Sequence, residues 1–156
     1  MSPSTSPPRT ADATAAGAWA AYRRMRELVD AAIARDIEHG TGLSLPDFEV
    51  LAATAELAAR LDCVRVGGLA AHLGWAHSRL SRQLGRMEKR GLIAREPCER
   101  DGRGDDVVLV EAGRTALRDA TPVHEAAVTR HLTGLLSGDQ LAALVGIEAV
   151  VARVRD

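Results

Sequence analysis

A row of cationic side chains is the feature of this sequence best suited to chemistry. The row comprises Arg79, Arg82, Arg86, Lys89 and Arg90. Its three- and four-residue spacing places these side chains on one side of a helix, and Leu80, Leu84 and Met87 share a second side. Guanidinium groups in such a row bind phosphates and the acceptor-rich edges of bases. The pattern therefore indicates binding of a polyanion, with an ordinary solvated helix face as the alternative.

The charge distribution supports the first interpretation. The chain carries a net charge of −1, yet residues 76–103 hold eight Lys or Arg against four Asp or Glu. Positive charge is thus concentrated around the cationic row. Arginine by itself is weaker evidence than usual here, because Lys89 is the one lysine among 20 basic residues.

Length and composition indicate one ordinary globular domain. The chain has 156 residues, 46% hydrophobic and 26% charged, and no apolar run approaches the ~20 residues that span a bilayer. Cys63 and Cys98 are expected to be reduced thiols, which places the protein in the cytoplasm. The Cys and His residues lack zinc-ligand spacing, so no metal is expected. No other cofactor is expected either. The sequence lacks the motifs of phosphate loops, dinucleotide-binding sites, nucleophile elbows and zinc proteases, which argues against an enzyme.

The hydrophobic pattern predicts a mainly α-helical fold with one small β-hairpin. Helices are expected over residues 13–38, 45–60, 66–73, 77–90, 112–136 and 138–156, and strands over residues 92–96 and 106–110. Ser44 and Ser137 are expected to cap helices, and the segment 40–42, Gly74 and Gly91 to end them. The order helix, turn, helix, hairpin in the middle of the chain predicts a winged helix-turn-helix.

Several linked motifs within about residues 66–118 carry a family resemblance. They are LAAHLG at residues 69–74, SRLSR at 78–82, RMEKRGLI at 86–93 with Arg95, DGR at 101–103, and EAGR at 111–114 after Val108 and Leu109. In this order and register the sequence resembles the MarR family of bacterial transcription regulators. Three positions depart from the family pattern: Ala76 and Val110 replace common Ser or Thr residues, and Gly102 replaces a frequent arginine.

The resemblance implies roles for individual residues. The residues expected to face the major groove of double-stranded DNA are Ser78, Arg79, Ser81, Arg82 and Arg86. Arg103, at the tip of the wing, would enter or flank the minor groove. Asp101 and Arg95 would orient the wing rather than contact bases.

The resemblance also implies a dimer. Residues 1–12 are expected to form a disordered tail, and residues 13–156 a single MarR-like domain. Its DNA-binding lobe would span about residues 45–111, and residues 13–38 and 112–156 would form dimerisation helices. Such a homodimer would bind a pseudo-palindromic operator, as a repressor.

Many proteins of this family release DNA when a small aromatic effector binds. The candidate effector pocket here consists of Trp19, Tyr22 and Phe48, for which an ordinary core position is the alternative. Two other functions stay open. One is a winged-helix protein-interaction module without specific DNA binding, and the other is a redox-sensing regulator that uses Cys63 or Cys98.

Overall fold

Six α-helices and one β-hairpin make up the part of the chain that this computed structural model describes, residues 14–99 and 104–154. The elements in chain order are α1 (Ala15–Thr41), α2 (Leu45–Ala58), α3 (Val66–Leu73), α4 (His77–Lys89), β1 (Ile93–Pro97), β2 (Asp105–Leu109), α5 (Glu111–His131), the 3-10 turn η1 (Thr133–Leu135) and α6 (Gly138–Ala152). The mainly helical fold with a hairpin is therefore confirmed. The expected tail at residues 1–12 lies outside the described residues.

Local sequence signals set the helix boundaries. Ser44 caps α2 through a reciprocal capping box with Asp47, and Ser137 caps α6 in the same way. Gly42 follows α1 with a φ of +74°, a left-handed conformation that most L-residues avoid. The helix α5 continues through Pro122 and ends at His131, about five residues earlier than expected.

The wing is a two-stranded antiparallel sheet, and its strand β2 also pairs with a short segment of the turn between α2 and α3. Ile93 pairs with Leu109, and Pro97 pairs with Asp105. On its other edge β2 bonds the turn between α2 and α3, because the Val107 amide donates to the Val64 carbonyl over 2.9 Å. The wing is thereby fixed to the helices at its base.

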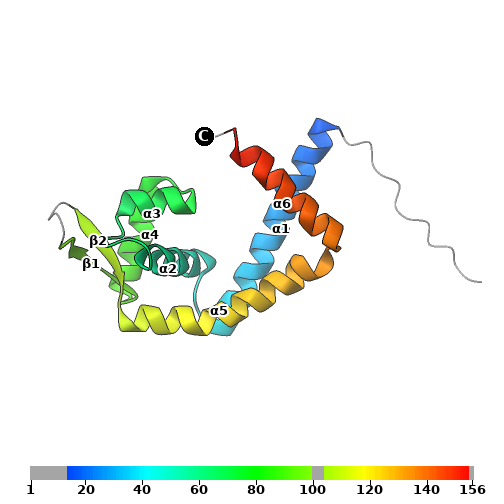
Figure 1. Ribbon diagram of the computed structural model, residues 1–156. Coiled ribbons are helices and arrows are strands. Elements are labelled where there is room, and N and C mark those ends of the chain that lie inside the picture. Colours follow the sequence, from blue (N-terminus) through cyan, green and yellow to red (C-terminus); the bar gives the residue numbers. More distant parts are fainter. Residues whose placement is uncertain (1–13, 100–103, 155–156) are drawn as a thin grey trace, which may run out of the picture.

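One hydrophobic core joins α2, α3, α4 and the wing to the long helices α1 and α5. It includes Leu51, Leu69 and Leu84 from the lobe, Ile93 from the wing and Ile37 from α1. Figure 1 shows α5 running from the wing along one edge of the molecule to α1, so that it connects the lobe with the terminal helices. Asp36 of α1 accepts hydrogen bonds from His131 Nε2 and Arg130 Nη1 of α5 at 2.9 and 2.6 Å. The hydrogen bond from His131 lowers the pKa of the Asp36 carboxyl below its usual value.

The terminal helices expose an unusual amount of apolar surface. None of the fifteen residues of α6, all of which the structure describes, is buried. The large exposed apolar side chains include Trp19, Tyr22 and Leu28 of α1 and Val145, Ile147, Val150 and Val151 of α6. In the view of Figure 1, α6 overlaps the N-terminal half of α1, on the side of the molecule away from α2, α3 and α4.

Within residues 14–99 and 104–154, no single helix has the length and apolar composition needed to cross a membrane. The segments Glu111–Leu135 and Gly138–Ala152 meet that requirement only together, and they are bent by 105° relative to each other.

The expectation of two reduced thiols is wrong. Cys63, in the turn after α2, and Cys98, directly after β1, form a disulfide bond with Cα atoms 6.0 Å apart. The two residues are 35 positions apart in sequence. Because the fold alone brings the α2–α3 turn against the wing, the sequence gives no sign of this proximity.

Candidate nucleic-acid interface

The helix α4 presents one apolar and one cationic face. Leu80, Leu84 and Met87 are fully buried and fix the helix on the core. On the other side Ser78, Arg79, Arg82 and Arg86 are exposed, and Ser81 is half-buried. Four of the five side chains expected to contact the major groove are thus open to solvent, and they lie on one helix.

The arginines of α4 differ in their contacts. The Arg79 guanidinium lies 3.8 Å from the centre of the Trp75 ring, a cation–π contact that holds it beside the turn. Burial raises the pKa of the nearby Glu49 carboxyl, and the positive charge of Arg79 partly opposes that shift. Arg86 donates to Gln83 Oε1. Arg82 has no such contact among the residues that the structure describes, so its guanidinium is available to a ligand.

A buried carboxylate connects the start of α2 with α4. The Asp47 side chain is almost completely buried and accepts hydrogen bonds from the Ser44 amide at 3.2 Å, from Gln83 Nε2 at 2.7 Å and from Arg90 Nη1 at 2.6 Å. Because Gln83 directs its amide nitrogen to Asp47, its carbonyl oxygen faces Arg86. Asp47 therefore sets the orientation of the Arg86 side chain through Gln83.

The sequence shows only part of this network. Asp47 is recognisable as an acidic residue in the first turn of a helix, and that signal explains its capping role. Its partners Gln83 and Arg90 are 36 and 43 residues away, and nothing in their spacing points to Asp47.

Replacing Asp47 by asparagine is expected to lower the free energy of unfolding by about 1–3 kcal/mol, because the amide cannot accept all three hydrogen bonds and leaves buried donors unsatisfied. Urea denaturation of both proteins measures the difference. Glu56→Gln is the matched control, since Glu56 is an acid of the same helix whose partners, Arg60 and His72, are both exposed. Equal losses in the two variants would contradict a structural role for the network.

Arg95 ties the wing to α4. Its Nη2 lies 3.5 Å from the Ser81 carbonyl oxygen, and its Nε lies 3.6 Å from Glu88 Oε2. Arg95 thus joins β1 to the cationic helix. The other two wing residues singled out from the sequence, Asp101 and Arg103, lie outside the described residues.

The start of α4 has no side-chain cap. Ala76 is the N-cap residue, and neither it nor Ser78 supplies a capping hydrogen bond. Val110, at the N-cap of α5, likewise supplies none. The first amides of α4 consequently keep their donors for another acceptor, such as solvent or a phosphate oxygen.

The three residues of the candidate effector pocket do not meet within one chain. Trp19 and Tyr22 stack on each other with ring centres 5.8 Å apart and are 61% and 50% exposed. Phe48 belongs to the core and stacks on His124 at 4.4 Å. Burial lowers the pKa of His124, so this ring is mainly neutral at pH 7. The separation arises because Trp19 lies about four helical turns before Ile33, where α1 enters the core.

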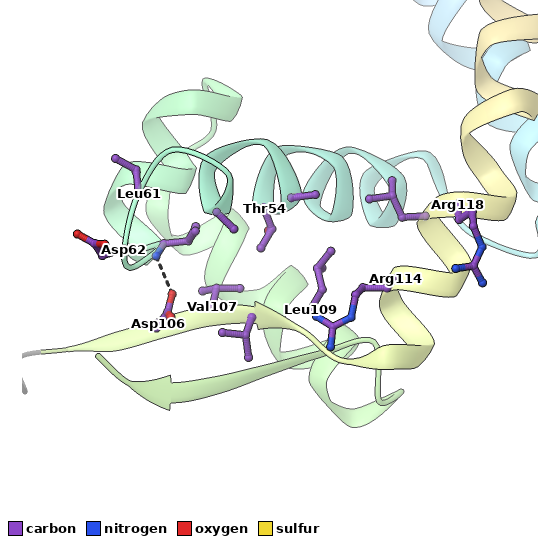
Figure 2. Close-up of a pocket in the computed structure, with 13 residues that line it drawn as sticks. Thr54, Leu61, Asp62, Asp106, Val107, Leu109, Arg114 and Arg118 are labelled. Atoms are coloured by element: carbon purple, nitrogen blue, oxygen red, sulfur yellow. Dashed lines mark hydrogen bonds between the residues drawn. The ribbon is translucent and has the colours of Figure 1, made fainter. Parts of the chain in front are cut away.

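A cavity of about 420 Å³ lies elsewhere in the lobe. Figure 2 shows it between α2, β2 and the start of α5, with Thr54, Val107 and Leu109 toward its interior and Arg114 and Arg118 at the α5 end. Its volume falls in the range of small-molecule sites. None of its lining residues belongs to the candidate effector pocket.

Comparison with known proteins places this geometry in a family. The model of the MarR family matches residues 41–104. The chain is 32% identical to AbsC, a MarR family transcriptional regulator from Streptomyces coelicolor, over 94% of this chain and 98% of that chain, with a TM-score of 0.80. No relative is found among curated proteins.

Two further solved structures are similar. Sco3205, a MarR family transcriptional regulator from Streptomyces coelicolor solved in complex with DNA, is 26% identical over 94% of each chain, with a TM-score of 0.78. CouR from Rhodococcus jostii RHA1, solved with p-coumaroyl-CoA, is 23% identical over 91% of this chain and 96% of that chain, with a TM-score of 0.75, and shares the fold. Regulators of this family bind DNA through a winged helix and are not enzymes. This chain belongs to the MarR family of transcriptional regulators.

Proposed function

We propose that this protein is a homodimeric, cytoplasmic repressor that binds a pseudo-palindromic operator in double-stranded DNA and leaves it when a small aromatic effector binds. In this proposal residues 45–111 form the DNA-binding lobe, and residues 13–38 and 112–156 form the dimer. Solved relatives support the two ligands, since Sco3205 was crystallised with DNA and CouR with p-coumaroyl-CoA.

The exposed cationic face of α4 is the observation that carries the proposal. Its opposite face is fixed by three fully buried apolar side chains, so the arginines project from a rigid support. We assign base and phosphate contacts in the major groove to Ser78, Arg79, Ser81, Arg82 and Arg86, and a minor-groove contact to Arg103. Arg95 and Asp101 would hold the wing in place.

The exposed apolar faces of α1 and α6 support the homodimer. A chain that buries no residue of a fifteen-residue apolar helix needs a second surface to cover it. A twofold dimer would set its two α4 helices about 34 Å apart, one turn of DNA. We assign the effector site to this region, where Trp19 and Tyr22 remain exposed. Phe48 packs in the core of the same chain and does not line it.

The test is a gel shift and footprint of the protein on the intergenic DNA upstream of its own gene, at two salt concentrations. Protection of a pseudo-palindrome, with affinity that falls steeply as salt rises, is the expected result. Absence of protection at low salt would favour the interaction module that keeps the fold without binding DNA specifically.

Replacing Arg82 by alanine is expected to weaken operator binding by roughly 1–3 kcal/mol, about 5- to 150-fold, because the guanidinium has no competing partner among the described residues. Titration of the protected fragment by gel shift measures the loss. Arg118→Ala, which removes the same charge from the exposed side of α5, should leave affinity within about twofold. If Arg82→Ala binds the operator as tightly as that control does, α4 is not the helix that contacts the bases.

A further inference from the structure

The disulfide lies at the base of the wing. Cys98 directly follows β1, and Cys63 belongs to the turn that also pairs with β2. In that turn the Val64 amide donates to Asp106 Oδ1 over 2.6 Å, the contact drawn in Figure 2. The two wing strands are thus held by one turn, β2 by hydrogen bonds and the end of β1 by a covalent bond.

This attachment lies where β1 ends and β2 begins. Residues 99–104 connect Cys98 to β2, and the Cys98 amide donates to the Gly104 carbonyl at 3.4 Å. Arg65, from the same turn, lies so close that a Cβ added to Gly104 would be 2.8 Å from its Nη1. Cys98 and Gly104, the described residues that flank the segment with Arg103, therefore both lie beside the α2–α3 turn.

The two sulfur atoms differ in access. Cys63 is half-buried, whereas Cys98 is only 4% exposed. An external thiolate would attack Cys63 Sγ and expel Cys98 as the thiolate, which takes up a proton. A second external thiol then releases Cys63, so that two thiols are oxidised to one disulfide while the protein gains two thiols.

The reverse reaction also balances with an ordinary oxidant. The Cys63 thiolate attacks a peroxide oxygen, the O–O bond breaks, and Cys63 becomes a sulfenic acid with release of an alcohol or water. The Cys98 thiolate then attacks that sulfur and releases water. The net reaction converts two thiols and one peroxide to the disulfide, water and the reduced peroxide.

We propose that Cys63 and Cys98 form a reversible dithiol–disulfide site that changes how tightly the wing binds DNA. The disulfide form binds DNA more tightly than the dithiol form. The inference rests on the proposed DNA-binding function. With the disulfide closed, the end of β1 is fixed to the α2–α3 turn before DNA arrives, so less conformational entropy of the wing strands is lost on binding. Reduction leaves only the hydrogen bonds between this turn and β2, so the end of β1 gains freedom.

The experiment compares the oxidised and the dithiothreitol-reduced full-length protein on one duplex, selected by the protein from a random-sequence pool. The reduced protein is expected to bind about threefold to tenfold more weakly, and hydrogen peroxide should restore the affinity. Thiol labelling followed by mass spectrometry should count two thiols in the reduced form and none after reoxidation. Hydrogen exchange should show faster exchange of residues 94–108 in the reduced form alone.

Two variants serve as controls. Cys63→Ser, at the half-buried position, should bind like the reduced wild type whether or not reductant is present. Because the chain has only two cysteines, Cys63→Ser/Cys98→Ser should not respond to either reagent.

Three results would overturn the inference. They are equal affinities of the two wild-type forms, thiols that stay free after peroxide, and a disulfide that links two chains on a non-reducing gel. Failure of the proposed function would look different, since neither form would then retard any duplex.

Discussion

Replacing both Val150 and Val151 by glutamate is expected to convert the protein to a monomer and to lower its affinity for a palindromic site at least about 100-fold. The two valines are 60% and 54% exposed on α6, so the substitutions remove little packing within one chain. In a dimer, however, they would bury unpaired carboxylates, which is strongly unfavourable. Each monomer would then hold a single half-site without the gain in effective concentration that a second lobe provides.

Light scattering and gel-shift titration together measure this effect. Glu148→Gln, an exposed substitution on the same helix, should change neither mass nor affinity. Deletion of residues 137–156 is expected to reproduce the loss. A double variant that stays monomeric yet binds the palindrome as tightly as the wild type would exclude α6 from the dimer, and with it the two-lobe explanation of specificity.

Replacing Gly113 by alanine is expected to cost about 3 kcal/mol or more in the free energy of unfolding. A Cβ on Gly113 would lie 1.9 Å from the Leu92 carbonyl oxygen and 3.4 Å from Leu51 Cδ2. The first contact is with backbone that already accepts a hydrogen bond from the Val110 amide, so neither side can move without breaking the junction of wing and α5.

Gly85→Ala is the matched control for this prediction. Gly85 lies inside α4, and an added Cβ would meet no other atom within 4 Å. This substitution should stabilise the protein, by up to about 1 kcal/mol, because alanine favours the helix. Urea denaturation should give opposite signs for the two variants. If both substitutions change the free energy of unfolding in the same direction, then the close approach of the Leu92 carbonyl oxygen is not the reason that position 113 requires glycine.

The local elements of this fold could be predicted because their signals are short in range. The capping boxes at Ser44 and Ser137 and the periodicity of Leu80, Leu84 and Met87 involve residues within one or two helical turns. The cationic face of α4 follows from the same periodicity, since burial of one side of a helix exposes the other. Family resemblance then connected that face with DNA.

Contacts between distant segments could not be predicted in this way. Asp47 is visible in the sequence as a helix cap, but its bonds to Gln83 and Arg90 depend on how α2 packs against α4. Trp19, Tyr22 and Phe48 share an aromatic character that suggested one pocket, yet the length of α1 separates the first two from the core.

The sequence by itself determined the helices, the hairpin, the cationic row and the family, because each of these depends on residue types at fixed local spacing. Only the tertiary structure decided that Cys63 bonds Cys98, that Asp47 orients Gln83 and that α6 stays uncovered in one chain. Those features depend on which surfaces meet in three dimensions. Local periodicity sets the buried side of a helix, but the packing of the whole chain decides what lies against it.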